Sequence, residues 1–117
     1  MDEAALKERT QSFALRMIRL ADSLGWRWAA GVIGKQLLRA GTSVGANYRA
    51  ACRGKSNADF VNELANVEEE LDESLYWMEL LVSAELVKGG LVAPLQREAD
   101  ELLSIIVASI KTARNKQ

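Results

Sequence analysis

The stretch from Val32 to Arg53 is amphipathic at the period of an α-helix. At about 100° per residue, its apolar side chains fall on one side: Ile33, Leu37, Val44, Tyr48 and Ala51. Every charge in the stretch is positive, and these charges form a narrow stripe on the opposite side: Lys35, Arg39, Arg49 and Arg53. Such a helix buries one face in a core and displays a line of bases. The functional question is therefore what those bases contact.

Three further segments repeat the helical period, and together they predict an all-α, antiparallel, up-and-down four-helix bundle. The predicted helices run from about Glu3 to Leu24, from Ala29 or Ala30 to Gly54, from Ala58 to Val87 and from Pro94 to Arg114. We expect Gly25 to stop the first helix and Ser56 to cap the third. Gly89 and Gly90 should close the third helix, and Pro94 fits a first helical position. The glycines of the second helix indicate close approach of a neighbouring helix, because each costs up to about 1 kcal/mol relative to alanine.

Length and composition limit the class of protein. A chain of 117 residues suits one domain, residues 1–117, and can bury a core without disulfides or metals. It has no histidine, which removes the commonest general base and metal ligand. Cys52 is its only cysteine and cannot form an internal disulfide. We therefore predict a cytoplasmic protein that is not an enzyme, with no catalytic residues, no metal site and no cofactor. No apolar run is long enough to span a bilayer, so no membrane partner is expected.

Two short patterns are excluded as sites of chemistry. Gly54-Lys55-Ser56 has the ending of a phosphate-binding loop, but Arg49 stands where that motif needs its first glycine, and no strand precedes it. The acids of the third helix crowd one segment and have no histidine to complete a two-metal site.

In the middle of the chain a segment with only basic charges is followed by a segment with only acidic charges. Between Ser23 and Ala58 every charged residue is basic: Arg27, Lys35, Arg39, Arg49, Arg53 and Lys55. Between Asp59 and Val87 every charged residue is acidic. We take Lys35, Arg49, Arg53 and Lys55 as candidate contacts for RNA or DNA backbones. The alternative is that acids neutralise these bases within the protomer or across an interface. The protein would then be an interaction scaffold for a protein partner, without nucleic-acid binding.

A polar group lies beside this stripe. Arg39, Ser43 and Asn47 follow one edge of the second helix at i, i+4 and i+8, and Glu70 and Glu73 lie midway along the third helix. We predict that these five residues form a structural network in which an Arg39–Glu70 pair fixes the register of the two helices.

The later part of the third helix is apolar on every side. Seven apolar residues between Leu75 and Val82 are interrupted only by Glu79. One intramolecular core cannot cover all sides of a helix in so short a chain, so this segment predicts self-association. Tyr76, Trp77 and Leu80 are the candidate contacts between copies. Trp26 and Trp28 either plug the end of the bundle or contact a partner.

Two segments carry a family resemblance. QLLRAGTSVGANYRAACRGKSNADF (residues 36–60) and EEELDESLYWMELL (residues 68–81) resemble the two motifs of the four-helix-bundle family of the 23S ribosomal RNA intervening-sequence protein. The matching positions are Arg39, Ser43, Asn47, Arg49, Glu70, Glu73, Tyr76 and Trp77. The resemblance implies a bundle that assembles into a homo-oligomeric ring, a homopentamer, in a bacterial protein without enzymatic activity. Distant relatives, the accessory proteins of diversity-generating retroelements, bind a reverse transcriptase and nucleic acid.

Overall fold

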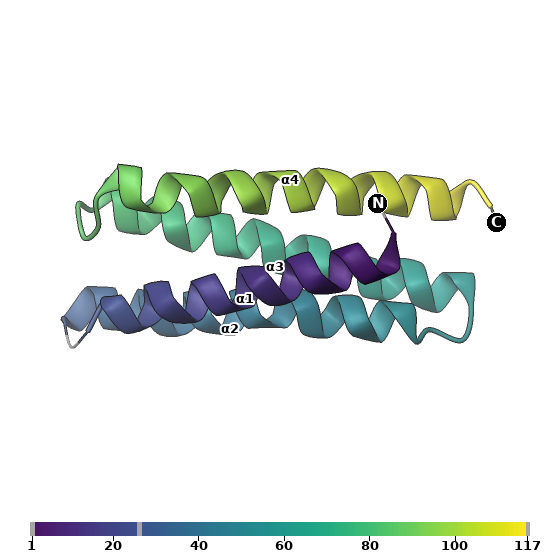
Figure 1. The fold of residues 1–117 in the computed structure, drawn as a ribbon, viewed down its shortest axis with the longest axis horizontal. Helices are drawn as coiled ribbons and strands as arrows, with labels where there is room; N and C mark the ends of the chain where they lie inside the picture. Colours follow the sequence, from purple (N-terminus) through teal and green to yellow (C-terminus); the bar gives the residue numbers. More distant parts are fainter. Residues whose placement is uncertain (1, 26, 117) are drawn as a thin grey trace.

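The computed structural model describes residues 2–25 and 27–116, and within them the chain forms four α-helices. These are α1 (Glu3–Ser23), α2 (Trp28–Cys52), α3 (Asn57–Ser83) and α4 (Gly89–Arg114). They run alternately in opposite directions and form a rod of 47 × 20 × 20 Å (Figure 1). No described residue belongs to a strand. The predicted all-α bundle is confirmed.

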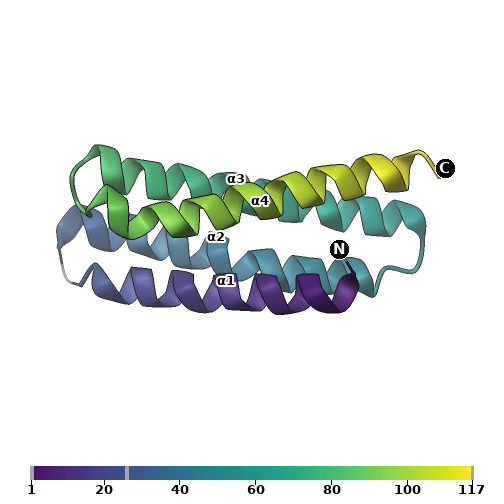
Figure 2. The same cartoon turned by 45° about the horizontal axis from the view of Figure 1, so that its top comes forward.

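Neighbours in the chain are neighbours in the bundle. α1 packs on α2, α2 on α3 and α3 on α4, while the contact between α1 and α4 is the least extensive of the four (Figure 2). Each helix contributes one apolar stripe to a shared core, because only side chains three or four positions apart face the same way. Its largest fully buried side chains include Phe13, Met17, Leu37, Leu64, Leu71, Met78, Leu102 and Ile106.

The glycines of α2 allow α1 to approach closely. A Cβ placed on Gly41 would lie 2.5 Å from Cγ of Met17, closer than two carbon atoms can pack. On Gly34 it would lie 3.0 Å from Cδ1 of Leu24. The predicted close approach is therefore confirmed, and it leaves the outer edge of the α1–α2 seam lined by small residues.

An ion pair joins α1 to α4. Arg9 on α1 donates to Glu98 on α4 through two nitrogens, Nη2 at 2.6 Å and Nε at 3.1 Å. Its guanidinium also lies 3.1 Å from Glu101. The hydrogen bond to Glu98 raises the pKa of Arg9 above its ordinary value. Arg9 therefore holds α1 and α4 together where their packing is least extensive.

Most helix ends follow their sequence signals. Gly25 takes a left-handed backbone conformation, φ 65°, directly after α1. Ser56 Oγ accepts the amide of Asp59 at 3.1 Å and caps α3. Asp59 in turn accepts the amide of Lys55 at 3.3 Å, so it helps to hold the connection that leads into the helix.

Two predicted boundaries are wrong. α3 ends at Ser83, not near Val87, because Glu85 turns the chain with a left-handed φ of 58°. The amide of Leu86 then donates to the carbonyl of Leu81 at 2.9 Å, and that of Glu85 to Val82 at 3.0 Å. This pairing is the Schellman motif, which usually has glycine where Glu85 stands.

α4 begins at Gly89 rather than at Pro94. Gly89 and Gly90 therefore open the fourth helix and do not close the third. Pro94 lies inside the helix, where it removes the hydrogen bond to the carbonyl of Gly90. Gly90 is exposed in the first turn, so water can satisfy that carbonyl, and the helix continues through the proline. Within the described residues, no helix combines the length and the apolar character needed to cross a bilayer.

Candidate nucleic-acid interface

The four candidate bases lie on the solvent side of α2 and just beyond its C-terminus. Lys35 and Arg49 are exposed on the helix, Arg53 is its exposed C-terminal cap, and Lys55 is exposed in the connection to α3. None of the four forms an ion pair with any residue that the structure describes. No acid among the described residues therefore pairs with their charge, although the acidic helix α3 runs alongside.

Arg39 belongs to the same stripe but has a different environment. Its Nη1 lies 3.2 Å from Oε2 of Glu70, and its Nη2 donates to Oε1 of Glu73. The hydrogen bond with Glu73 raises the pKa of Arg39 and lowers the pKa of the Glu73 carboxyl. The same Glu73 oxygen accepts Nε1 of Trp77 at 3.2 Å. Arg39 is thus committed to joining α2 to α3.

The structure brings together only part of the predicted polar network. Arg39, Glu70 and Glu73 are in contact, and Trp77 joins them. Ser43 donates its hydroxyl to the carbonyl of Arg39 at 2.7 Å, a bond within its own helix. Asn47 is half-buried one turn further on and makes no hydrogen bond to these residues in the described structure.

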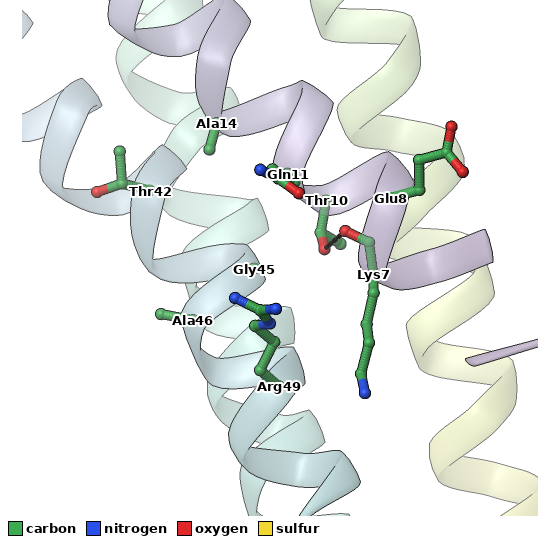
Figure 3. A pocket seen from close by; sticks show the side chains of 9 residues that line it. All are labelled: Lys7, Glu8, Thr10, Gln11, Ala14, Thr42, Gly45, Ala46 and Arg49. Atoms are coloured by element: carbon green, nitrogen blue, oxygen red, sulfur yellow. Dashed lines mark hydrogen bonds between the residues drawn. The ribbon is translucent and has the colours of Figure 1, made fainter. Parts of the chain in front are cut away.

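The outer edge of the α1–α2 seam is hollowed at two places. The first hollow, of about 410 Å³, lies at the Arg49 end (Figure 3). Arg49 borders it from α2 and Lys7 from α1, with Gly45 between the helices. The Lys7 ammonium lies 3.3 Å from Glu3, an exposed pair one turn apart that leaves the ammonium accessible. The basic stripe therefore borders a groove rather than a flat helix surface.

The second hollow, of about 360 Å³, lies at the opposite end of the seam. Its wall is low because Gly25, Gly31 and Gly34 line it, and Trp28 and Lys35 border it. Trp28 is 89% exposed, the largest exposed fraction of any large apolar residue described. It does not plug the end of the bundle. Trp26, the tryptophan considered together with Trp28 in the sequence, lies outside the described residues.

The candidate contacts between copies lie on α3, away from the seam. Tyr76 is 52% exposed and packs edge-on against Trp77, with ring centroids 5.1 Å apart and an interplanar angle of 63°. Trp77 and Leu80 are half-buried. The protomer therefore leaves the tyrosine ring largely uncovered and covers the other two side chains in part.

Sequence reasoning missed the contribution of α1. Lys7 and Gln11 face the first hollow, and Asp22 faces the second. Their segment mixes both charges, so it carries no stripe that sequence analysis could find. What places them is the glycine-dependent approach of α1 to α2. Elsewhere, within residues 2–25 and 27–116, no three Cys, Asp or Glu side chains are grouped so that they could hold a metal ion.

Comparison with known proteins finds a family model and solved structures that match the chain. A family model described as "23S rRNA-intervening sequence protein" matches residues 3–108. A crystal structure of a protein of unknown function, from the S23 ribosomal protein family of Bacteroides thetaiotaomicron, is 33% identical. It aligns over 95% of this chain and 99% of its own with a TM-score of 0.88. No curated protein matches the chain significantly.

Proposed function

The chain belongs to the 23S rRNA-intervening sequence protein family, and from this premise we propose that it is a non-catalytic, oligomeric protein that binds RNA or DNA. The contacts are the exposed bases Lys35, Arg49, Arg53 and Lys55. One observation carries this proposal: none of these bases is ion-paired within the described residues, even though α3 supplies many acids.

The spacing of the bases suits phosphate contacts. At about 1.5 Å per residue, Lys35 and Arg53 lie about 27 Å apart along α2. A line of that length contacts several phosphates of one strand and does not read base sequence. The formal net charge of −1 does not oppose this, because α2 itself contains no acid and its bases create a local positive field.

A ring of copies would strengthen the interaction. We propose a closed homo-oligomer, five-membered as the resemblance implies, with Tyr76, Trp77 and Leu80 at the contacts between protomers. The uncovered Tyr76 ring supports this placement, since aromatic side chains are enriched in interfaces. Each copy would add one basic stripe, so several weak backbone contacts act together.

Two features of the sequence support a protein that is not an enzyme and that is located in the cytoplasm. The absence of histidine favours binding over catalysis, because no imidazole is available as a general base. The single Cys52 leaves no internal disulfide to require an oxidising compartment, which favours a cytoplasmic location.

Filter binding with structured RNA and duplex DNA at low and moderate salt tests the proposal. We expect the parent to retain nucleic acid at low salt and to release it steeply as salt rises, because counterion release drives such binding. The triple variant Lys35→Glu, Arg49→Glu, Arg53→Glu should lose retention while its helical circular dichroism is unchanged.

A matched control separates the stripe from total charge. Lys88, Arg97 and Lys116 are exposed and lie outside α2, so the triple change of these residues to Glu alters net charge equally. The control variant should keep most of the binding. If both triple variants lose it equally, the stripe is not the site. If the parent retains neither RNA nor DNA at low salt, the protein-scaffold alternative replaces the proposal.

A further inference from the structure

The hollow beside Trp28 lies at one end of the basic stripe. Trp28 and Lys35 are seven residues apart on α2, nearly two full turns, so they lie on the same side of the helix about 10 Å apart. We propose that this hollow binds an unpaired nucleobase, stacked on Trp28, and that the preferred ligand is therefore single-stranded. This inference rests on the proposed function and names the form of nucleic acid that the stripe receives.

The Trp28 ring is available for stacking. With 89% of the residue exposed, the indole makes little use of its apolar surface in the protomer. Aromatic rings beside a line of bases are a recurring means of binding single strands, because every nucleobase offers a flat face for stacking. A base that covers the indole would bury apolar surface that the fold leaves in water.

The glycines make room for a flat ring next to the indole. A Cβ on Gly31 would meet only the carbonyl oxygen of Gly25, at 3.7 Å, and one on Gly25 would meet nothing within 4 Å. Among residues 2–25 and 27–116, little therefore crowds the space beside Gly25 and Gly31. A volume of about 360 Å³ falls in the range of sites that bind small ligands.

Polar groups surround the hollow at suitable places. Lys35 is exposed and not ion-paired within the described residues, so it is available to the phosphate that follows the bound base. The Arg27 guanidinium is exposed and donates to the carbonyl of Leu86. Its other N–H groups have no partner among the described residues and can bind a second phosphate. Asp22 is the one acid among the lining residues, and its carboxylate can accept N–H groups of a base edge.

The geometry favours an unpaired strand over a duplex. In a duplex the faces of the bases are covered by their neighbours, and a single open indole cannot reach them. An unpaired strand can turn one base onto Trp28 while its phosphates continue along Lys35 toward Arg49. Stacking at one end and phosphate contacts along the helix are then made by one ligand.

Equilibrium binding of one labelled oligonucleotide, single-stranded and annealed to its complement, tests the inference in the full-length protein. Trp28→Ala should weaken single-strand binding about 5- to 150-fold, in line with the loss of one stacked base. It should change duplex binding less than about 2-fold, because a duplex leaves no base face open to the indole. Trp28→Phe should restore most of the single-strand affinity, because its ring still stacks.

Gly31→Leu is a second, steric probe. Its Cβ fits the protein, leucine favours helix, and the longer side chain would occupy the hollow. We expect it to weaken single-strand binding without lowering the melting temperature. Unchanged single-strand affinity in both Trp28→Ala and Gly31→Leu would overturn the inference, as would equal losses for single strand and duplex.

The remaining outcomes separate this inference from the proposed function. If the triple stripe variant loses binding and Trp28→Ala does not, only the inference fails. If the parent binds neither ligand, both fail. The oligomeric state of Trp28→Ala is measured by light scattering. A change from the parent would place Trp28 between copies of the chain and overturn its assignment to a nucleobase.

Discussion

The guanidinium of Arg39 and the carboxylate of Glu73 are in contact across the seam between α2 and α3. The same carboxylate accepts the indole N–H of Trp77 one turn along α3. Glu73 therefore connects the basic helix to the aromatic pair that carries the predicted contacts between copies. A change at this carboxylate acts on both the packing of α2 against α3 and the orientation of Trp77.

The Arg39–Glu73 contact predicts a pH-dependent stability. Because the hydrogen bond from Arg39 lowers the pKa of Glu73 in the folded chain, its contribution is fully present above the unfolded pKa and is lost as pH falls through the folded pKa. We expect Glu73→Gln to lower the free energy of unfolding at pH 7 by at most about 1 kcal/mol, since the guanidinium is half exposed.

That difference should shrink as the pH falls below 4.5, the ordinary pKa of this carboxyl. Denaturant unfolding at a series of pH values measures it. Glu69→Gln is the control, because Glu69 is exposed on the same helix and makes no ion pair with the described residues. A difference between parent and Glu73→Gln that does not vary with pH would contradict the prediction.

Gly41 is the tightest point of the α1–α2 seam. We expect Gly41→Ala to lower the free energy of unfolding by about 1–3 kcal/mol, the usual range for overpacking, because the new Cβ would lie 2.5 Å from Met17. The gain in helix propensity, up to about 1 kcal/mol, does not offset this. Gly31→Ala is the matched control on the same helix and should stabilise the protein, because its Cβ has room. Equal stability of Gly41→Ala and the parent, measured by denaturant unfolding, would mean that α1 moves away at little cost.

Glu85 holds a backbone conformation that glycine adopts more easily. Its φ of 58° costs a residue with a side chain about 1–2 kcal/mol. Glycine would avoid this cost in the folded chain, but it also has more conformational freedom to lose from the unfolded chain. We therefore expect Glu85→Gly to raise the free energy of unfolding by about 0.5–1 kcal/mol. Ala84→Gly is the control and should lower stability, because Ala84 has an ordinary φ of −83°. A Glu85→Gly variant with a lower melting temperature than the parent would show that the Glu85 side chain contributes more than its backbone conformation costs.

The fold could be predicted from the sequence because each helix has its own apolar stripe. The two errors occurred where a local signal was ambiguous. The Gly89-Gly90 pair resembles a helix end, but the end of α3 is made by Glu85, a residue type with no preference for a left-handed φ. Pro94 is tolerated inside α4 because the carbonyl that it leaves without a partner is exposed. Where α3 ends and whether α4 continues through Pro94 both depend on small differences in free energy, which residue type alone does not reveal.

The candidate site could be predicted in part. Helical spacing placed Lys35, Arg49 and Arg53 on one side, and the structure shows which of the stripe's bases is paired. Arg39 bridges two acids that lie three residues apart on the facing helix, and Arg9 bridges Glu98 and Glu101 in the same way. This repeated spacing is a signal in the sequence. The glycines of α2 predicted that a neighbouring helix approaches closely, but not that this helix is α1, so the two hollows could not be placed from the sequence.

Tyr76 tests where copies of the chain contact each other. Tyr76 is 52% exposed in the protomer, so Tyr76→Glu should not disturb the core. In a contact between copies the new carboxylate would be buried without a partner, and it would also lie among other acids of α3. We therefore expect light scattering to show an oligomer for the parent at micromolar concentration and dissociated protomers for Tyr76→Glu, with equal helical content.

Leu91→Glu is the matched control, because Leu91 is 72% exposed and lies on α4, away from the predicted contact. It should leave the oligomer intact. Trp77→Glu should also dissociate the copies, but it places a second carboxylate beside Glu73 and so disturbs the protomer as well. Tyr76→Glu therefore decides the location of the interface. An intact oligomer in that variant would move the contacts to another surface, and a monomeric parent would remove the ring from the proposed function.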